Sequence, residues 1–463
     1  MTTAGLTTGP APGKQTWQGV GERLRRRAAV VAGAALVAAP LAACGAFGDD
    51  SGPPTLTWYI NPDAGGQAEI ASRCTDEADG AYTIDTSLLP RDATSQREQL
   101  VRRLASNDSS IDLMSIDPPF IPEFAEAGFL APVPEELAES STEDIVESAQ
   151  EGAMWDDELV TVPFWANTQL LWYRKSAVED AGLDLEEPVT WQQVLEAARE
   201  SGSTVAVQGT LAESLTVWAN ALIESAGGEI LPDPDVDPED LDVQLDTEAG
   251  RLAATIMREV TEDSEIAGSA VTTADEDASN VLFMGDSGGF MVNYPFVYAA
   301  VRATLDAAKE AGDQEGARAA QEQLDDIGWG IYPRAVEGEE AAPPYGGINL
   351  GVGAFSEHVD LSYDAIACIV TEENQAYYFV SNGNPPAKNA AYDDEEVREL
   401  YPMAPVIRES LDLAAPRPQT PYYSEVSGGL QRIWHPTTAL DPEVDPAEAE
   451  DLITAVLRKE ALL

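Results

Sequence analysis

The segment Gly285-Asp286-Ser287-Gly288-Gly289 has the form of the nucleophile segment of trypsin-like serine proteases. A serine nucleophile of that kind needs a histidine base within hydrogen-bonding reach. The chain has only two histidines, His358 and His435, and both follow Ser287, whereas those proteases place the histidine well before the serine. The pattern of an all-β fold is also missing. We therefore interpret the segment as a turn that enters a strand.

Metal and nucleotide chemistry have no motif in this sequence. Two isolated histidines and widely spaced cysteines do not give the ligand spacing of a zinc site. No EF-hand loop of spaced Asp and Asn residues occurs, and neither does a phosphate-binding GxxxxGK[ST] loop. We expect no metal and no cofactor, and any ATP hydrolysis must come from a separate protein.

Paired carboxylates are the remaining route to catalysis, because glycosidases work with two of them. The chain has 82 Asp and Glu residues, so a pair found by inspection carries almost no information. A membrane-anchored glycosidase stays open as an alternative, distinguished by release of monosaccharide from a disaccharide. We expect no catalytic residues.

Several aromatic residues say more, because they stand in loop-like contexts beside polar side chains. They are Trp165, Tyr294, Tyr345, Tyr422 and Tyr423. Sugar sites combine flat rings, which cover the C–H face of a pyranose, with carboxylates, amides and arginine, which take its hydroxyls. This combination favours a saccharide as the ligand.

The first part of the chain alternates strand and helix patterns. The predicted elements are strands at 55–60, 82–88 and 111–116, and helices at 66–77, 95–105 and from 119. This alternation is typical of an α/β domain with a largely parallel sheet. Ligands of such sheets lie beyond the carboxyl ends of the strands, where Asn61 and Asp117 are found.

Two later segments are candidate crossings between domains. Short strands at 161–165 and 169–173 flank the first, at 166–168, and the Gly-rich residues 345–353 form the second. The elements predicted between them are helices at 191–200, with Thr190 as N-cap, 215–226, 248–261 and 275–284, a strand at 289–293, and one or two helices over 298–324.

The N-terminus has the pattern of a secretory signal. Basic residues precede a short apolar stretch from Ala28 to Ala43, and small residues lead directly to Cys44. This order resembles a bacterial lipobox, which implies cleavage after residue 43 and a lipid on Cys44. A signal anchor with an incidental cysteine remains the alternative, and the export route stays open between general secretion and the twin-arginine system. Residues 44–54 read as a tether, with the folded protein on the outer face of the cell membrane.

The formal net charge of −56 excludes two classes of partner. So acidic a chain is repelled by nucleic acid and by anionic membrane surfaces. The acids are spread along the chain, which suits a saline habitat and says little about the ligand. Once Cys44 is lipidated, Cys74 and Cys368 remain, and in an oxidising compartment they form either one disulfide or two buried thiols.

Several stretches in this order and spacing carry a resemblance to a known family. They are "IDLMSIDPPFIPEFAEAGFLAPV", "VPFWANTQLLWYRK", "PVTWQQVLEAA", "LFMGDSGGFMVNYP", "YGGINLGV" and "RPQTPYY". Over residues 54–463 the chain resembles the extracytoplasmic sugar-binding proteins of ATP-binding-cassette importers, of the maltose/trehalose-binding type. It looks most like the actinobacterial trehalose-binding lipoproteins.

The resemblance implies a type II periplasmic-binding-protein fold, with two α/β lobes that close on a ligand at hinge crossings. The implied division is a signal peptide at 1–43, a tether at 44–54, a first lobe from 55–166 and 347–395, and a second lobe from 167–346 and 396–463. Relatives pair cysteines at the positions of Cys74 and Cys368, which implies a disulfide.

Residue by residue, the family motifs map the sugar contacts onto this chain. The implied contacts are Asp117, Asn167, Glu276 with Asp275 as a close competitor, Tyr294 where relatives often have tryptophan, the backbone of Gly346 and Gly347, and Arg417. Asn61 and Asp63 are further candidates because they follow the first strand. The expected function is to bind a disaccharide, with trehalose favoured over maltose or another oligosaccharide or polyol. A monomer would deliver it to a membrane permease served by a separate ATPase.

Overall fold

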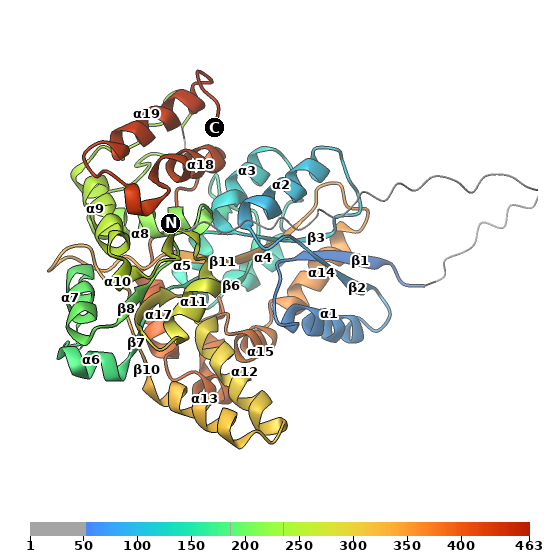
Figure 1. Cartoon of the computed structure of the whole chain (residues 1–463). Coiled ribbons are helices and arrows are strands. Elements are labelled where there is room, and N and C mark those ends of the chain that lie inside the picture. The colour runs from blue at the N-terminus through green and yellow to red at the C-terminus, as the bar shows by residue number, and fades with distance from the viewer. Residues whose placement is uncertain (1–51, 186, 235) are drawn as a thin grey trace, which may run out of the picture. The chain divides into compact units, whose positions relative to one another are not determined.

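The computed structural model describes residues 52–463 except 186 and 235, and Figure 1 shows their arrangement. The predicted signal sequence, Cys44 and the first part of the tether lie outside the described residues. Strands and helices alternate along the described chain, as the sequence predicts. None of the helices in this part is both long and apolar enough to span a bilayer.

The first sheet has five strands in the order β2-β1-β3-β11-β6. Its strands are β1 (Thr55–Ile60), β2 (Thr83–Leu88), β3 (Leu113–Ile116), β6 (Val162–Thr168) and β11 (Tyr345–Val352). β1 pairs in parallel with both β2 and β3, whereas β11 runs antiparallel to β3 and β6. The carboxyl ends of β1, β2 and β3 therefore meet at one edge of the sheet.

Helices cover both faces of this sheet. They are α1 (Gly66–Glu77), α2 (Ala93–Leu104), α3 (Ile121–Glu126) and α14 (Val359–Ile369), and smaller ones are α4 (Glu135–Thr142) and α5 (Glu147–Glu151). Alternation along β1 divides the core: Trp58 packs with α1 and α14, and Tyr59 packs with α2 and α3. In Figure 1, α2 and α3 accordingly lie on the opposite side of β1 and β3 from α1 and α14.

The second sheet has four strands in the order β10-β7-β9-β8. They are β7 (Leu170–Arg174), β8 (Thr204–Ala206), β9 (Gly288–Asn293) and β10 (Ile327–Gly330); β4 (Met154–Trp155) and β5 (Glu158–Leu159) form a separate hairpin. The predicted first crossing, 166–168, is the end of β6 in the first sheet, and the chain passes to the second sheet through Gln169, one residue later. The second predicted crossing, at 345–353, is wrong. Residues 345–352 form a strand bonded to β3 and β6, so the return lies in residues 331–344. The lobe boundaries stay a prediction.

Most helices between the two crossings pack on the second sheet. They are α6 (Lys175–Ala181), α7 (Trp191–Ser201), α8 (Glu213–Ser225), α9 (Glu248–Glu262), α10 (Ser264–Ala267), α11 (Glu276–Met284), α12 (Phe296–Glu310) and α13 (Gln314–Asp326). The predicted Thr190 cap of α7 is confirmed: Thr190 Oγ1 accepts the Gln193 amide, and Gln193 Oε1 accepts the Thr190 amide. α7 and α8 share one hydrophobic core with Phe290 of β9, and α11 and α12 share another with Met291.

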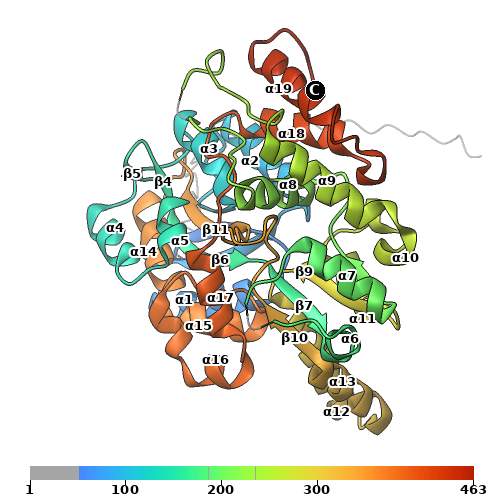
Figure 2. The same ribbon diagram turned by 90° about the vertical axis from the view of Figure 1, so that its left-hand side faces the viewer.

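The C-terminal part of the chain is helical and was not predicted in detail. Its helices are α15 (Glu372–Asn382), α16 (Glu395–Leu400), α17 (Ala404–Asp412), α18 (Tyr423–Trp434) and α19 (Asp445–Leu457). α18 packs against α8, and α19 against α9, at the top of Figure 2. The end of the chain thus adds a layer to the core of the second sheet.

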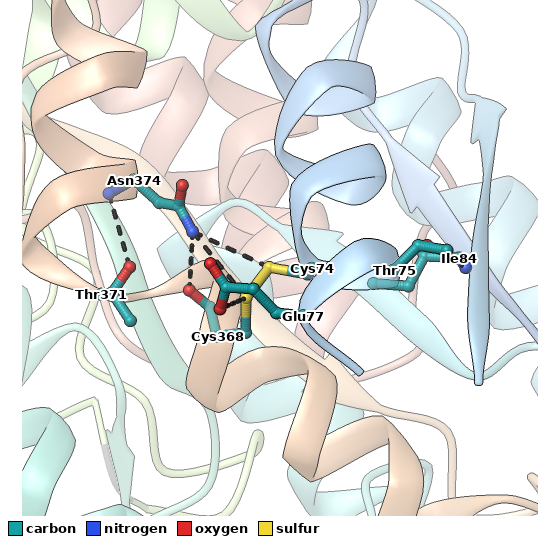
Figure 3. The surroundings of a disulfide bond; sticks show 7 residues. All are labelled: Cys74, Thr75, Glu77, Ile84, Cys368, Thr371 and Asn374. Carbon is teal, nitrogen blue, oxygen red and sulfur yellow. Dashed lines mark hydrogen bonds between the residues drawn. A yellow bond between two sulfur atoms is a disulfide. The ribbon is translucent and has the colours of Figure 1, made fainter. Parts of the chain in front are cut away.

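A disulfide joins Cys74 of α1 to Cys368 of α14, 294 positions along the chain, and the implied pairing is present (Figure 3). Both helices cover the same face of the first sheet. Asn374 Nδ2 donates to the Cys368 carbonyl oxygen at 2.9 Å and lies 3.7 Å from Cys74 Sγ. The bridge therefore ties the returning segment to the first domain.

We expect the Cys74→Ser/Cys368→Ser double variant to lose about 2–5 kcal/mol of unfolding free energy, because a bridge across so long a loop restricts the unfolded chain strongly. Urea unfolding followed by circular dichroism measures the loss. Each single variant should match the double variant, and wild type with dithiothreitol should approach it. Identical midpoints for oxidised and reduced wild type would contradict the expectation.

Glu224, near the end of α8, makes the stability of the fold depend on pH. Burial, and then the neighbouring Glu229 carboxylate, raise its pKa from 4.5 to about 8. A carboxyl with a raised folded pKa stabilises the fold fully below the unfolded value, and this contribution is lost as the pH rises through the folded value. Between about pH 5 and pH 8 the melting temperature of Glu224→Gln should therefore fall less than that of wild type. Glu239→Gln, at an exposed acid, is the control and should track wild type.

Candidate functional site

Asp117 stands directly after β3, at the edge where the parallel strands end. Pro118 and Pro119 follow it, and the strand stops because proline has no amide to donate to a ladder. The Asp117 side chain is 18 % exposed. The local sequence thus presents a carboxylate at the site where α/β sheets bind ligands.

Arg417 lies in the segment between α17 and α18 and is almost fully buried. Proline on both sides keeps this segment out of a helix, and the Pro416 carbonyl accepts a hydrogen bond from Asn220 Nδ2 of α8 at 3.1 Å. Arg417 Nη2 donates to Asp117 Oδ1 at 2.6 Å, and Nη1 donates to Oδ2 at 3.2 Å. A guanidinium held near the second sheet therefore grips a strand end of the first sheet in a two-point contact.

Glu213, the first residue of α8, is the second carboxylate on Arg417. Its Oε1 accepts from Arg417 Nη1 at 2.9 Å and from the Tyr423 hydroxyl, and its Oε2 accepts from Ser427 Oγ at 2.7 Å. Burial raises the pKa of Glu213, while Arg417 and these donors oppose that rise. The N-terminal end of α8 also favours a negative charge at this position.

Tyr423 connects this cluster to the first sheet. Its ring meets Phe120 edge-on, with centroids 5.4 Å apart, and the Arg417 guanidinium carbon lies 5.9 Å from the Tyr423 ring centre. Tyr423 is 1 % exposed. The start of α18 is thus packed against the turn that follows Asp117.

Tyr294 and Glu276 enter from the second sheet. Tyr294 follows β9. Its hydroxyl is close enough to Arg417, Glu276 and Asp117 for their charges to act on it, and Gln169 lies beside it. Burial raises the pKa of this hydroxyl. Glu276 begins α11, and burial, followed by Asp275 and other neighbouring acids, raises its pKa as well. Asp275, the competitor of Glu276, is exposed and accepts the Ala278 amide as the helix cap.

A network of buried amides holds these two residues in place. Gln169 Nε2 donates to Gln208 Oε1 at 3.1 Å, and Gln208 Nε2 donates to the Val292 carbonyl at 2.8 Å. Asn293 Nδ2 donates to the Glu276 carbonyl at 2.9 Å, and Asn293 Oδ1 accepts the Tyr294 amide at the same distance. The hinge residue Gln169 is therefore linked to the strand that carries Tyr294.

Gly346, Gly347 and Asn167 lie together in the ladder between β11 and β6. Gly346 pairs with Asn167, whose Oδ1 already accepts the Thr168 amide at 3.0 Å. Gly347 has a φ of 126°, and a Cβ there would lie 2.3 Å from the Trp165 carbonyl oxygen, so only glycine fits. The adjoining Tyr345 is close enough to Asp117 and Arg417 for both to act on its hydroxyl.

Asn61 and Asp63 follow β1, the neighbour of β3, and so stand at the same edge as Asp117. Asp63 is occupied locally: its two carboxylate oxygens accept the amides of Gly65 and Gln67 at the start of α1. Asn61 Oδ1 is buried without a hydrogen-bond partner among the described residues. Sugar contact by either residue stays a prediction.

Some of these residues carry a buried polar atom without a hydrogen-bond partner, as do others elsewhere in the described chain. Within the described part of the chain these atoms include Asn61 Oδ1, Gln169 Oε1, Tyr345 Oη and Arg417 Nε. Buried polar groups are normally hydrogen-bonded, so such a group of unused donors and acceptors points to a solute with several hydroxyls. The charged groups, amides and aromatic rings described here are suited to binding a solute.

Sequence reasoning missed Glu213, Gln169 and Gln208. The predicted helix at 215–226 left Glu213 just outside it, and nothing local marks that residue. Gln169 carried a signal, because it directly follows the predicted first crossing at 166–168. Trp165, a candidate ring, stacks with Phe164 and Tyr378 in the core and is 6 % exposed.

Residues 83–376 match the model of the bacterial extracellular solute-binding protein family. The chain belongs to this family. Its members bind solutes and do not transform them, so the chain is a solute-binding protein and not an enzyme, and the glycosidase alternative is excluded.

Solved structures share the fold of this solute-binding protein. Maltose-bound MalE3 of T. maritima is 21 % identical, with a TM-score of 0.72 over 88 % of this chain and all of that one. The GacH receptor of Streptomyces glaucescens, solved unliganded and with acarbose, is 18 % identical, with a TM-score of 0.72 over 88 % of this chain and 98 % of that one. The predicted two-lobed α/β fold is confirmed.

Curated relatives match over shorter stretches. A probable ABC transporter-binding protein of Deinococcus radiodurans is 26 % identical over 281 residues, 57 % of this chain and 59 % of that protein. A mannitol-binding protein of Pseudomonas aeruginosa is 28 % identical over 102 residues, 22 % of this chain and 23 % of that protein. The chain thus spans about three-fifths of the first relative and a quarter of the second.

The cluster predicts a pattern of stabilities that separates charge compensation from packing. Arg417→Met should cost about 3–5 kcal/mol, because Glu213 is left buried without its counter-charge. Adding Glu213→Gln should recover at least about 1 kcal/mol of this loss, since no uncompensated buried charge remains at that position. Urea midpoints of the two single variants and the double variant give the coupling.

Arg432→Met is the matched control, because this exposed residue also removes one positive charge from a very acidic protein. It should shift the midpoint by less than about 0.5 kcal/mol. A double variant no more stable than Arg417→Met would show that Glu213 and Arg417 are not energetically coupled.

Proposed function

We propose that this protein is the solute-binding subunit of an ATP-binding-cassette sugar importer. It binds a disaccharide at the meeting edge of the two sheets and delivers it to a membrane permease driven by a separate ATPase. The observation that carries the proposal is the Arg417–Asp117 pair at the strand ends, surrounded by buried donors and acceptors without partners. Similar proteins that bind maltose, acarbose and mannitol support a polyhydroxylated ligand.

Trehalose is the favoured ligand within this class, and its support is the resemblance of the sequence motifs to trehalose-binding lipoproteins. Maltose, another oligosaccharide or a polyol is the alternative. The same resemblance and the N-terminal pattern support a lipid on Cys44, an extracytoplasmic location on the outer face of the membrane, and a monomeric protein. The predicted contacts are Asp117, Glu276, Tyr294 and Arg417, with Asn61, Asp63, Asn167, Gly346 and Gly347 around them.

In the proposed mechanism the two lobes close around the solute, and no covalent bond is made or broken. Solute hydroxyls exchange water for charge-assisted hydrogen bonds, each worth about 1.5–3 kcal/mol. A solute that contacts both lobes favours the closed form by its differential affinity for that form over the open one. The permease then receives the closed protein.

A thermal-shift screen with trehalose, maltose, mannitol and acarbose side by side tests the function. We expect at least one of them to raise the melting temperature, with trehalose giving the largest rise. Titration calorimetry with the best ligand should then show that Asp117→Ala binds at least about tenfold more weakly, a loss of roughly 1.4 kcal/mol.

The control for this variant is Asp85→Ala, which removes an exposed carboxylate from β2 of the same sheet. It should bind as wild type does. A flat screen across all four compounds would count against the whole proposal, and unchanged affinity in Asp117→Ala would remove that residue from the site.

A further inference from the structure

The charges around the site are unequal in number. Asp117 and Glu213 both bond to Arg417, so this guanidinium has no charge left to offer. Arg91, on the loop after β2, pairs with Asp277 of α11 at 2.9 Å. Among the described residues, both of these arginines are therefore already paired with carboxylates.

Glu276 is the acid that this pairing leaves out. Within the described part of the chain its carboxylate forms no ion pair; burial raises its pKa most, its own backbone amide opposes the rise, and the neighbouring charges that add to the rise are acids. Asp275 and Asp277 belong to its own helix, and Asp92 reaches it from the start of α2. Tyr294 faces it from the end of β9.

The position of Glu276 is fixed independently of these charges. Asn293 Nδ2 donates to its backbone carbonyl and Asn293 Oδ1 accepts the Tyr294 amide, so Asn293 holds Glu276 beside Tyr294. Gln169 Oε1 and Tyr345 Oη, in side chains 1 % and 2 % exposed, have no partner among the described residues. Leu170 pairs with Asn293 and Tyr345 pairs with Thr168, so Gln169 and Tyr345 lie near the end of the strand that precedes Tyr294, and their free atoms mark a ligand position there.

We propose that the site accepts a basic nitrogen on its saccharide opposite Glu276 and rejects saccharides that carry a carboxylate or a phosphate. This inference rests on the proposed function. An ammonium supplies the counter-charge that the protein does not, whereas an added anion brings a further uncompensated charge next to partly buried acids. A neutral sugar brings no charge and binds between these extremes.

The test compares ligands that differ only in charge. The first set is trehalose, its monoamino analogues with the nitrogen at each hydroxyl-bearing carbon in turn, and trehalose 6-phosphate; the second set repeats this on maltose. Calorimetry at pH 7 and low salt gives the affinities. We expect at least one amino analogue to bind about fivefold or more tightly than its parent, and the phosphate to bind at least about tenfold more weakly.

Glu276→Gln keeps the shape and removes the charge. It should lose the preference for the amino analogue, so that this analogue and the neutral parent bind the variant with similar affinity. Glu265→Gln, an exposed acid on α10, removes one charge elsewhere and should keep the wild-type order of affinities.

Three results would overturn the inference while leaving the proposed function intact. They are amino analogues that never bind more tightly than the parent, a phosphate that binds as well as the parent, and an amine preference that survives in Glu276→Gln. If no compound of either set binds, whatever its charge, the proposed function fails and the inference fails with it.

Discussion

The structure depends on one buried positive charge. Arg417 is 4 % exposed, and a buried guanidinium is tolerated only where carboxylates and hydrogen bonds compensate its lost hydration. Asp117 and Glu213 provide that compensation, and they lie 300 and 204 positions away along the chain. One side chain therefore fixes a strand end of the first sheet and a helix start of the second against the C-terminal segment.

The same contacts that hold the two sheets together also form the candidate site. Tyr423 packs on Phe120, and Glu425 of α18 acts on Arg97 of α2, so α18 follows the first sheet closely. The Arg91–Asp277 pair adds a contact between the loop after β2 and α11, but its side chains are 81 % and 66 % exposed, and such pairs contribute little. Stability and solute affinity thus share the buried network and not the surface charges.

Local sequence predicted the parts of the fold that local rules determine. The bounds of β1 and α1 agree residue for residue with expectation, and Asp117 was found because it follows a buried strand and precedes two prolines. Arg417 came from a motif and not from a physical rule. Glu213 was missed because its role arises from contacts more than 200 positions away, which no local pattern encodes.

The failure at the second crossing has a similar cause. Glycines in 345–353 suggested a flexible connection, whereas Gly347 is required where the backbone passes close to the Trp165 carbonyl inside a ladder. Glycine marks close packing and turns alike, so its presence alone does not distinguish a hinge from a strand. The true connection, 331–344, contains prolines and acids that are common in any surface loop.

Polar residues at strand ends can either bond to the backbone or bind a solute, and their hydrogen bonds show which of them already serve the backbone. Asp63 gives both carboxylate oxygens to the amides that begin α1, and Asn167 gives Oδ1 to the next amide, so these oxygens already serve the backbone. Asn61 Oδ1 and Tyr345 Oη serve nothing in the described chain although they are buried. A fold that leaves such groups unpaired loses stability for each one, unless a bound molecule supplies the missing partner. Recognition is therefore expected where the backbone has not already used the side chain, which makes Asn61, Tyr345 and the Nε atom of Arg417 the candidates for solute contact.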